Sequence, residues 1–499
     1  MLGSTLTSSN RTIYWLKQTQ LAAGSLLASD PGMQQIQQIV GNTGNLNRTT
    51  ADWKEFQPRV GFAWDIGGNG KNVIRGGYGI ARDQIFQNIT LFSVQQTQPT
   101  IYQTLFDYVG DNAPGARCTP TAPFNICSFR FGIDPLPVPP AGTNAADISP
   151  GAVGRIVNPR ITDPWSQQFS VGYARQLGTD YVVSVDYYHT LGTHEERVLN
   201  ANPNIKPLCS ASFPGSHPLD PRCVRGANTR LMDLAFKTAG AQLGLASLSA
   251  GRFAHIYEYS TNNRSMYDGI NLQLRKRLSH RMMFQVNDVI SWARSWGGFP
   301  VASYGGSGQA VTPNQQFAAN EFQRTNFDER NRLVFSGIFD LPAGFQLSPI
   351  FQASSARPYS MLTGLDVDGD GRHIIDRVCA GSTVSNPLYP TDSNHTPSGC
   401  TMIKPNTLPG KAFIQMNLRA AKHFAITERA RLWLYAEFFN LFNRANFCNS
   451  YEEDVTDPEF NKPRAFCEGP SNAAAGGVSG FSAFAIPSLH TQLGLRFEF

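Results

Sequence analysis

The last stretch of the chain, residues 489–499, alternates strictly between apolar and polar side chains. Successive side chains of a β-strand point to opposite faces, so this pattern predicts a terminal strand with one apolar face and one polar face. Such a strand fits between lipid and water, and it also fits a soluble β-sandwich. The apolar set is Leu489, Thr491, Leu493, Leu495, Phe497 and Phe499, and the polar set is His490, Gln492, Gly494, Arg496 and Glu498.

Five earlier pairs of segments show the same alternation, and each pair is joined by a few turn-forming residues. In the first pair the turn is Gly67-Gly68-Asn69-Gly70, and glycine and asparagine readily adopt the positive φ angles that a tight reversal needs. Five hairpins of two strands each, with the terminal strand, predict eleven strands. The paired segments are 60–66 with 74–80, 167–175 with 181–188, 270–275 with 284–290, 333–341 with 345–352, and 413–424 with 432–438.

The segments between the hairpins are much longer than the turns within them. Outer-membrane barrels have short periplasmic turns and long external loops, and a soluble sandwich has no reason to separate its loops in this way. The sequence therefore predicts an all-β fold, an antiparallel transmembrane β-barrel with long external loops. The long connections are 84–164, 193–264, 295–329, 360–411 and 443–487.

Strand parity indicates that the predicted strands belong to a larger barrel. If the last strand ends on the periplasmic side, the strand at 60–66 also runs toward that side, and residues 1–56 begin outside the cell. Eleven strands do not make an even-numbered barrel, and an open wall leaves backbone groups unpaired in lipid. Plugged outer-membrane transporters have about 22 strands, twice this number. We therefore expect residues 57–499 to be the C-terminal portion of such a barrel and residues 1–56 to be an external loop.

Composition supports a membrane wall and excludes several other classes of protein. Charged residues make up 16% of the chain and aromatic residues 11%, against roughly 25% charged residues in soluble domains. The net charge of +5 is small for 499 residues and no Lys/Arg block occurs, so no nucleic-acid partner is expected. No run of about 18 apolar residues occurs, which excludes membrane-spanning helices. Residues 1–28 do not have the pattern of a secretory signal.

The eight cysteines lie in the long connections as four pairs of close neighbours. This arrangement predicts disulfides between neighbours, which require an oxidising compartment. Zinc binding is the alternative, although no Cys-x-x-Cys or Cys/His cluster supports it. The expected disulfides join Cys118 to Cys127, Cys209 to Cys223, Cys379 to Cys400, and Cys448 to Cys467.

Four aspartates in the connection 360–411 form a candidate calcium site. Asp366, Asp368 and Asp370 stand at every second position around glycines, with Asp376 beyond them. Hard oxygen ligands at this spacing suit Ca²⁺, the one cofactor that the sequence suggests. Arg377 occupies the position at which an EF-hand has its closing glutamate, so the alternative interpretation is an acidic turn at the end of a strand.

Polar-facing arginines are candidates for a basic barrel interior, where they either line a substrate path or are paired charges that contact a plug or each other. Trp292 and Trp296, with Trp433 and Tyr435, are expected at the lipid–water interface, because amphipathic rings are stable at the level of the headgroups. No catalytic pattern of residues occurs, so no enzymatic activity is expected. The arginines are Arg59, Arg75, Arg275, Arg277 and Arg496.

Several motifs point to one family: FQPRVGFAWD at 56–65, NVIRGGYG at 72–79, DERNR at 328–332, and EFFNLFN at 437–443 followed by NF at 446–447. Over residues 57–499 the chain resembles the barrels of TonB-dependent outer-membrane receptors of the Oar-like type. The resemblance implies an outer-membrane protein that takes up or binds an external ligand, using energy passed by TonB to a plug domain. The terminal phenylalanine resembles the signal read by the barrel-assembly machinery. The plug domain and TonB box of the family have no counterpart here, so partnership with TonB requires a plug encoded upstream.

Three classes of function follow from the sequence. The first is the barrel component of an outer-membrane transporter or receptor, whose external ligand has no recognisable motif in the loops. The second is a passive porin or a surface adhesin, in which the long disulfide-linked loops bind partners. The third is a secreted all-β binding module. Only the first two place outer-membrane lipid against the apolar faces of the strands.

Overall fold

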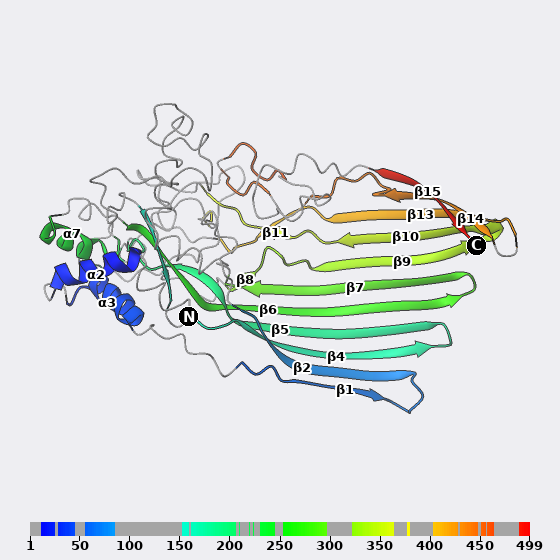
Figure 1. Ribbon diagram of the computed structural model, residues 1–499, viewed down its shortest axis with the longest axis horizontal. Helices are drawn as coiled ribbons and strands as arrows, with labels where there is room; N and C mark the ends of the chain where they lie inside the picture. The colour runs from blue at the N-terminus through cyan, green and yellow to red at the C-terminus, as the bar shows by residue number, and fades with distance from the viewer. Residues whose placement is uncertain are drawn as a thin grey trace.

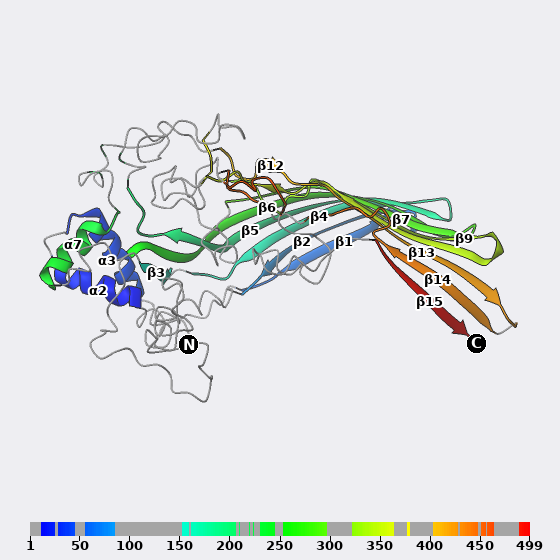
Figure 2. The ribbon, with the colours of Figure 1, turned by 90° about the horizontal axis from the view of Figure 1, so that it is seen from above.

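The computed structural model describes residues 11–24, 28–44, 55–84, 152–158, 161–205, 209, 219, 223, 230–244, 253–296, 322–363, 377–379, 403–427, 430–447, 451–455, 457–463 and 489–499. These residues form a long curved sheet with a group of helices at one end (Figures 1 and 2).

The main element is an antiparallel path of eleven strands that follow one another in chain order, which confirms the predicted number and sequence of strands. In Figure 2 the sheet curves like part of the wall of a cylinder. Within the described residues, β1 and β15 form its two edges, and each has a neighbour on one side only. The strands are β1 (Arg59–Asp65), β2 (Asn72–Arg82), β4 (Trp165–Leu177), β5 (Tyr181–Asn200), β6 (Phe253–Ser279), β7 (Met282–Ser295), β9 (Asn331–Leu341), β10 (Phe345–Ser354), β13 (Phe413–Ala425), β14 (Arg431–Phe439) and β15 (His490–Glu498).

All five hairpin turns lie at the end of the sheet where the chain reaches its C-terminus, which we call the turn end (Figure 1). The turn from β1 to β2 contains Gly67, Gly68 and Gly70 with φ angles of 97°, 64° and 69°, a region that glycine enters without steric cost. The turn from β9 to β10 is the short helix η6 (Pro342–Gly344). The opposite end, which carries the helices, is the loop end.

Four short strands lie outside the path of eleven. β3 (Ala152–Val157) pairs in parallel with the first part of β6, and β8 (Gln323–Arg324) pairs with β7. β11 (Pro358–Tyr359) and β12 (Leu408–Pro409) form a separate sheet. β5 and β6 are 20 and 27 residues long, whereas about 10 residues suffice to cross a bilayer. These two strands therefore continue beyond the membrane into the loop end.

Three helices at the loop end enclose an apolar core: α2 (Arg11–Ala23), α3 (Pro31–Gly44) and α7 (Asp233–Gln242). The core brings the N-terminal segment against the connection between β5 and β6. No helix in the described ranges has both the length and the apolarity needed to cross a membrane. The buried side chains of this apolar core include Ile13, Leu16, Met33, Ile36, Met232, Ala235, Phe236 and Ala239.

Residues 1–56, which we expected to be an external loop, contain the helices α2 and α3. Met33 and Ile36 recur at helical spacing and are fully buried. Asp30 begins α3 by accepting a hydrogen bond from the Met33 backbone N at 2.9 Å, and Pro31 occupies the first helical position. The segment that contains α2 and α3 packs against α7, which lies about 200 residues away in the sequence. The segment therefore cannot form this core alone.

The two faces of the sheet differ in chemistry along its whole width. The strand registers align most of the apolar residues on one face, which we call the apolar face, and most of the polar residues on the other, the polar face. Large apolar side chains are exposed on the apolar face, up to 79% at Leu493. A soluble protein seldom exposes so extensive an apolar surface, and a lipid bilayer covers it. Representative apolar-face residues are Phe62, Val171, Val185, Leu272, Val286, Phe335, Leu434 and Leu495.

Candidate functional site: the polar face and the loop end

The five predicted arginines lie on the polar face, but they are spread over four strands. The register pairs Arg59 with Gly79 at one edge and Arg496 with Trp433 at the other, while Arg275 lies opposite Gln285 near the middle. The arginines therefore do not form one site. Alternation along each strand was enough to predict that these arginines share one face, but not which residues they contact. The remaining members are Arg75 on β2 and Arg277 on β6.

Arg75 makes an ion pair across the neighbouring strand. Its Nε and Nη2 donate to the two carboxylate oxygens of Asp186 at 2.9 and 2.7 Å. Arg75 belongs to β2 and Asp186 to β5, and Gly172 of β4 lies between them. A Cβ atom at Gly172 would lie 1.9 Å from Asp186 Oδ1, so the pair needs glycine at this position. Arg75 thus forms an ion pair within the sheet.

The polar face contains a cavity of about 550 Å³ in the middle of the wall. The side chains of Ser336 and Ser348 are small and leave this volume unfilled, and the charged side chains of Arg419 and Glu437 lie at its edge. The Arg419 guanidinium lies 4.2 Å from the Tyr435 ring centroid, and its Nε is 3.8 Å from Glu437 Oε1. Both hydrogen-bonding and charged groups can therefore contact a polar molecule. Further lining residues are Arg275, Gln285, Ile338, Asn417 and Phe439.

The motif at 328–332 organises the rim of the sheet at the loop end. The buried Asp328 carboxylate accepts hydrogen bonds from Arg324 and from the Ala293 backbone N, the latter at 2.7 Å. Glu329 pairs with Arg332 at 2.9 Å and with Arg357 at 3.1 Å. These contacts connect β7, β8, β9 and the segment after β10. The motif therefore has a structural role that sequence reasoning did not assign.

The motif at 437–447 has a similar role where β14 ends. Asn446 is fully buried; its Oδ1 accepts a hydrogen bond from Ile414 N and its Nδ2 donates to Ile414 O, both at 3.0 Å. Its side chain therefore replaces a neighbouring strand at the start of β13. Asn440 has a φ of 50° and its backbone N donates to Asn417 Oδ1 at 2.9 Å. Asparagine tolerates this left-handed conformation better than most residues.

Three half-buried or buried carboxyl groups lie at the loop end, beyond the membrane. Burial raises the pKa of Glu195, which accepts a hydrogen bond from Ser265. Burial also raises the pKa of Glu258, which accepts one from Asn158. The pKa of Glu453 is raised by burial to about 7, despite the opposing effect of a backbone hydrogen bond from Ser360. Of the three, Glu453 therefore keeps its proton at mildly acidic pH.

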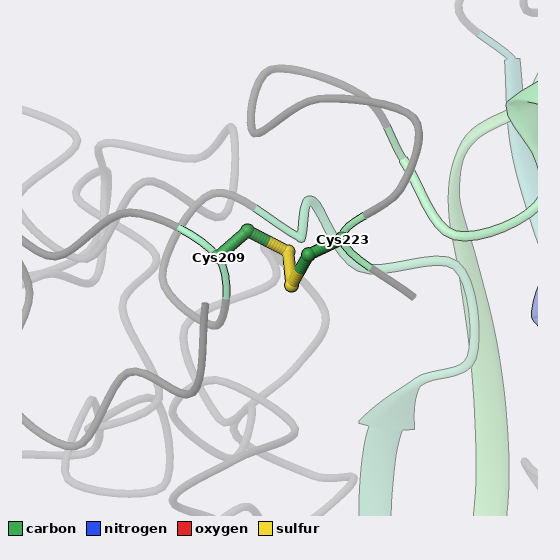
Figure 3. The surroundings of a disulfide bond; sticks show 2 residues. All are labelled: Cys209 and Cys223. Carbon is green, nitrogen blue, oxygen red and sulfur yellow. A yellow bond between two sulfur atoms is a disulfide. The ribbon is translucent and has the colours of Figure 1, made fainter. Parts of the chain in front are cut away.

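Among the described residues, the predicted disulfide between Cys209 and Cys223 is present in the connection before α7 (Figure 3). Cys379 is also disulfide-bonded, while its expected partner Cys400 lies outside the described residues. The expected calcium ligands Asp366, Asp368, Asp370 and Asp376 lie outside them as well, as do Cys118, Cys127, Cys448 and Cys467. No cluster of three metal-ligating side chains occurs in the part of the chain that the structure describes.

The aromatic residues expected at the membrane interface divide between the faces. Trp292 lies on the apolar face near the loop end, in register with Asp268. The placement of Trp433 and Tyr435 was wrong: they lie on the polar face, opposite Arg496 and Gly494. The physical reason is alternation itself, because the apolar Leu432 and Leu434 take the lipid-facing positions of β14.

A family model described as "Outer membrane beta barrel domain" matches residues 5–473. No curated protein sequence matches the chain significantly.

Solved structures that match this chain include the outer membrane transporter YddB from Escherichia coli, at 9% identity and a TM-score of 0.40, covering 78% of this chain and 37% of that one. A mutant of the ferric enterobactin receptor PfeA from Pseudomonas aeruginosa has 9% identity and a TM-score of 0.38, with 89% and 40% covered. The siderophore receptor PiuA from Acinetobacter baumannii has 8% identity and a TM-score of 0.37, with 88% and 35% covered. The chain thus spans two fifths or less of the length of these structures.

Proposed function

Because the chain belongs to the outer membrane beta barrel domain family, we propose that it forms part of the wall of a TonB-dependent transporter in the outer membrane. On this proposal the polar face borders the path of an external ligand, and the apolar face contacts lipid. The observation that carries the proposal is the open two-faced sheet, whose polar face contains the cavity beside Arg419 and Glu437. The motifs that resemble TonB-dependent receptors support the assignment to active transport. The proposal includes no enzymatic step.

The direction of the edge strands supports a wall that is completed by other strands. β1 runs toward the turn end, and so does β15, because it is antiparallel to β14, which begins at the turn end. Two copies inserted in the same orientation would therefore bring β1 and β15 together in parallel. An antiparallel closure needs a partner with an odd number of strands whose first and last strands run away from the turn end, and a second copy in the same orientation does not supply this direction.

The partners follow from this arrangement. Outer-membrane lipid covers the apolar face, the barrel-assembly machinery receives the C-terminal strand, and the external ligand binds at the loop end. TonB is a partner if a plug domain is encoded upstream. The chemical class of the ligand is set by loops that carry no transferable motif.

Thiol labelling tests the two faces. In intact outer membranes, Ser336→Cys on the polar face should react with a charged, water-soluble maleimide, and Val185→Cys on the apolar face should react only with a lipid-soluble one. The unsubstituted chain serves as the baseline for the native cysteines. Equal labelling of both positions by the charged reagent would contradict a membrane wall.

Energy dependence tests transport against the alternatives. Uptake through the complete transporter should stop when a protonophore removes the inner-membrane potential, whereas flux through a passive porin should continue. A surface adhesin is the second candidate, because the helical core and the Cys209–Cys223 disulfide form an ordered structure at the loop end. An adhesin should bind its partner without any uptake, with or without the protonophore.

A further inference from the structure

Three arginines gather on the apolar face where the sheet reaches the loop end. Arg294 of β7 lies directly opposite Arg324 of β8 in the strand register. Arg330, just before β9, places its guanidinium carbon 5.9 Å from the centroid of the Trp292 ring. Trp292 and Arg294 have the same parity on β7 as the lipid-facing Val286, so all three guanidinium groups face the lipid side.

The carboxylates that face this cluster are already engaged. Asp328 is fully buried and shared, since Arg324 and Arg330 both pair with it, Arg330 Nε at 2.9 Å. Asp268 is the acidic neighbour of Arg294, and it accepts hydrogen bonds from Tyr187 and His189.

Two more carboxylates lie nearby and have other partners. Asp288 accepts a hydrogen bond from Asn331 at 2.7 Å, and Glu329 pairs with Arg332 and Arg357. Three guanidinium groups therefore lie beside only two carboxylates, Asp328 and Asp268, and both carboxylates already have hydrogen-bond partners. The cluster therefore has an excess of positive charge.

The arginines also repel one another. Burial, together with the positive charges of Arg324 and Arg294, lowers the pKa of Arg330, although Asp328 acts in the opposite direction. The Arg294 residue is exposed. An anion placed between the three groups would relieve this repulsion, and guanidinium groups bind phosphate through paired hydrogen bonds.

The position of the cluster selects the kind of anion. Tryptophan next to a basic side chain marks the headgroup level of a membrane, and the loop end is the side on which outer-membrane barrels carry their long external loops. We propose that Arg294, Arg324 and Arg330 form a site for the phosphate group of a lipid headgroup in the outer leaflet. The acyl chains of that lipid would lie along the apolar face below Trp292. Such a site goes beyond the proposed transport function and does not depend on it.

Native mass spectrometry of the detergent-extracted chain tests the site, with diphosphorylated lipid A as the probe and its dephosphorylated form for comparison. Arg294→Gln should lower the affinity for the diphosphorylated lipid about fivefold, the usual effect of one basic group near a phosphate surface. Arg294→Lys should restore most of it. The matched control is Arg175→Gln, an exposed arginine of the apolar face at the turn end, which should leave the affinity unchanged.

Several outcomes would overturn the site. Equal affinity for the phosphorylated and dephosphorylated lipids would show that phosphate is not recognised. Equal losses in Arg294→Gln and Arg175→Gln would show that charge acts without a site. Competition by inorganic phosphate at millimolar concentration would show that a soluble anion is the ligand. Retained heat-modifiable migration of each variant in SDS confirms that the comparison is made on folded protein.

Discussion

At the residue scale, the motifs that resemble a receptor family have structural roles at the rim of the sheet. Asp328 connects β7 to its neighbours through backbone and arginine hydrogen bonds, and Asn446 replaces a strand partner for Ile414. Both side chains are buried. A buried polar group is costly when it loses its partners, so these positions tolerate few substitutions. The motifs therefore stabilise the ends of the strands at the loop end of the sheet.

The Arg75–Asp186 pair gives a first prediction. Arg75→Ala leaves a carboxylate whose side chain is 6% exposed without its guanidinium partner. Because Arg75 itself is half exposed, we expect a loss of about 1 to 3 kcal/mol of stability. The measurement is the temperature at which the SDS-resistant form is lost. Arg496→Ala is the control, since Arg496 pairs with exposed Glu498 on the edge strand; an equal shift in both variants would contradict a special role for Asp186.

Glu453 gives a second prediction, on pH. Burial raises its pKa to about 7, whereas a carboxyl group of this kind in an unfolded chain has a pKa of about 4.3. Between these values the folded state holds a proton that the unfolded state has released, so stability falls as pH rises through this window. Hydrogen exchange at residues 451–455, corrected for intrinsic rates, should be faster at pH 8 than at pH 5.

Two variants check this assignment. Glu453→Gln should remove the pH dependence, because glutamine does not titrate. Glu459→Gln, which changes an exposed side chain in the same connection, should retain it. A pH dependence that survives in Glu453→Gln would assign the effect to another group.

At the element scale, the unexpected feature is the contact between α3 and α7. The backbone of α3 approaches the residues just before α7 so closely at Gly32 that a Cβ atom there would lie 2.0 Å from the Leu231 carbonyl oxygen. This contact joins two segments that are distant in sequence. The helices are individually short, and short helices are stable only when they pack against other elements.

Gly32→Ala should therefore separate the N-terminal helices from the rest of the loop end, at a cost of about 1 to 3 kcal/mol. Limited proteolysis should cleave the segment 11–44 faster, while the strands stay protected. Gly41→Ala is the matched control in the same helix, because a Cβ atom there meets nothing within 4 Å; it should leave cleavage unchanged or slow it. Equal cleavage of the two variants would mean that the close approach does not hold the helices.

At the scale of the whole molecule, the wall and the loop end have different sources of stability. The wall is held by ladders between eleven strands and by lipid. The loop end depends on a small helical core, buried polar groups and disulfides. Regions with separate contacts open separately, so damage to one end should leave the other intact.

Reduction of the Cys209–Cys223 disulfide tests this independence. Its cysteines are 14 residues apart in the sequence, and closing a loop of that size contributes about 3 kcal/mol in the chain-entropy model. Dithiothreitol, or the double substitution Cys209→Ser with Cys223→Ser, should increase protease cleavage between residues 205 and 230. The SDS-resistant migration of the wall should not change. Joint loss of both properties would show that the two ends unfold as one unit.

Alternation along the chain was sufficient to predict the strands, their order, the two faces and the grouping of short turns at one end. The reason is that lipid and water impose a period of two on each strand, and tight turns require residues such as Gly67 and Gly68. The shared face of Arg75, Arg275 and Arg496 follows from the same period. Within the site, alternation thus predicted the face of these arginines, whereas Trp433 and Tyr435 were assigned to the wrong face.

Only the tertiary structure decided which side chains meet. Asp186 contacts Arg75 across β4 because Gly172 has no side chain between them. These residues are 111 positions apart, so no local sequence pattern predicts their contact. The helical core, the cavity beside Arg419 and the arginine cluster around Asp328 likewise join distant segments. A side chain's face depends on its own strand, whereas its partner depends on register, close approach and burial, which arise only when the strands pair.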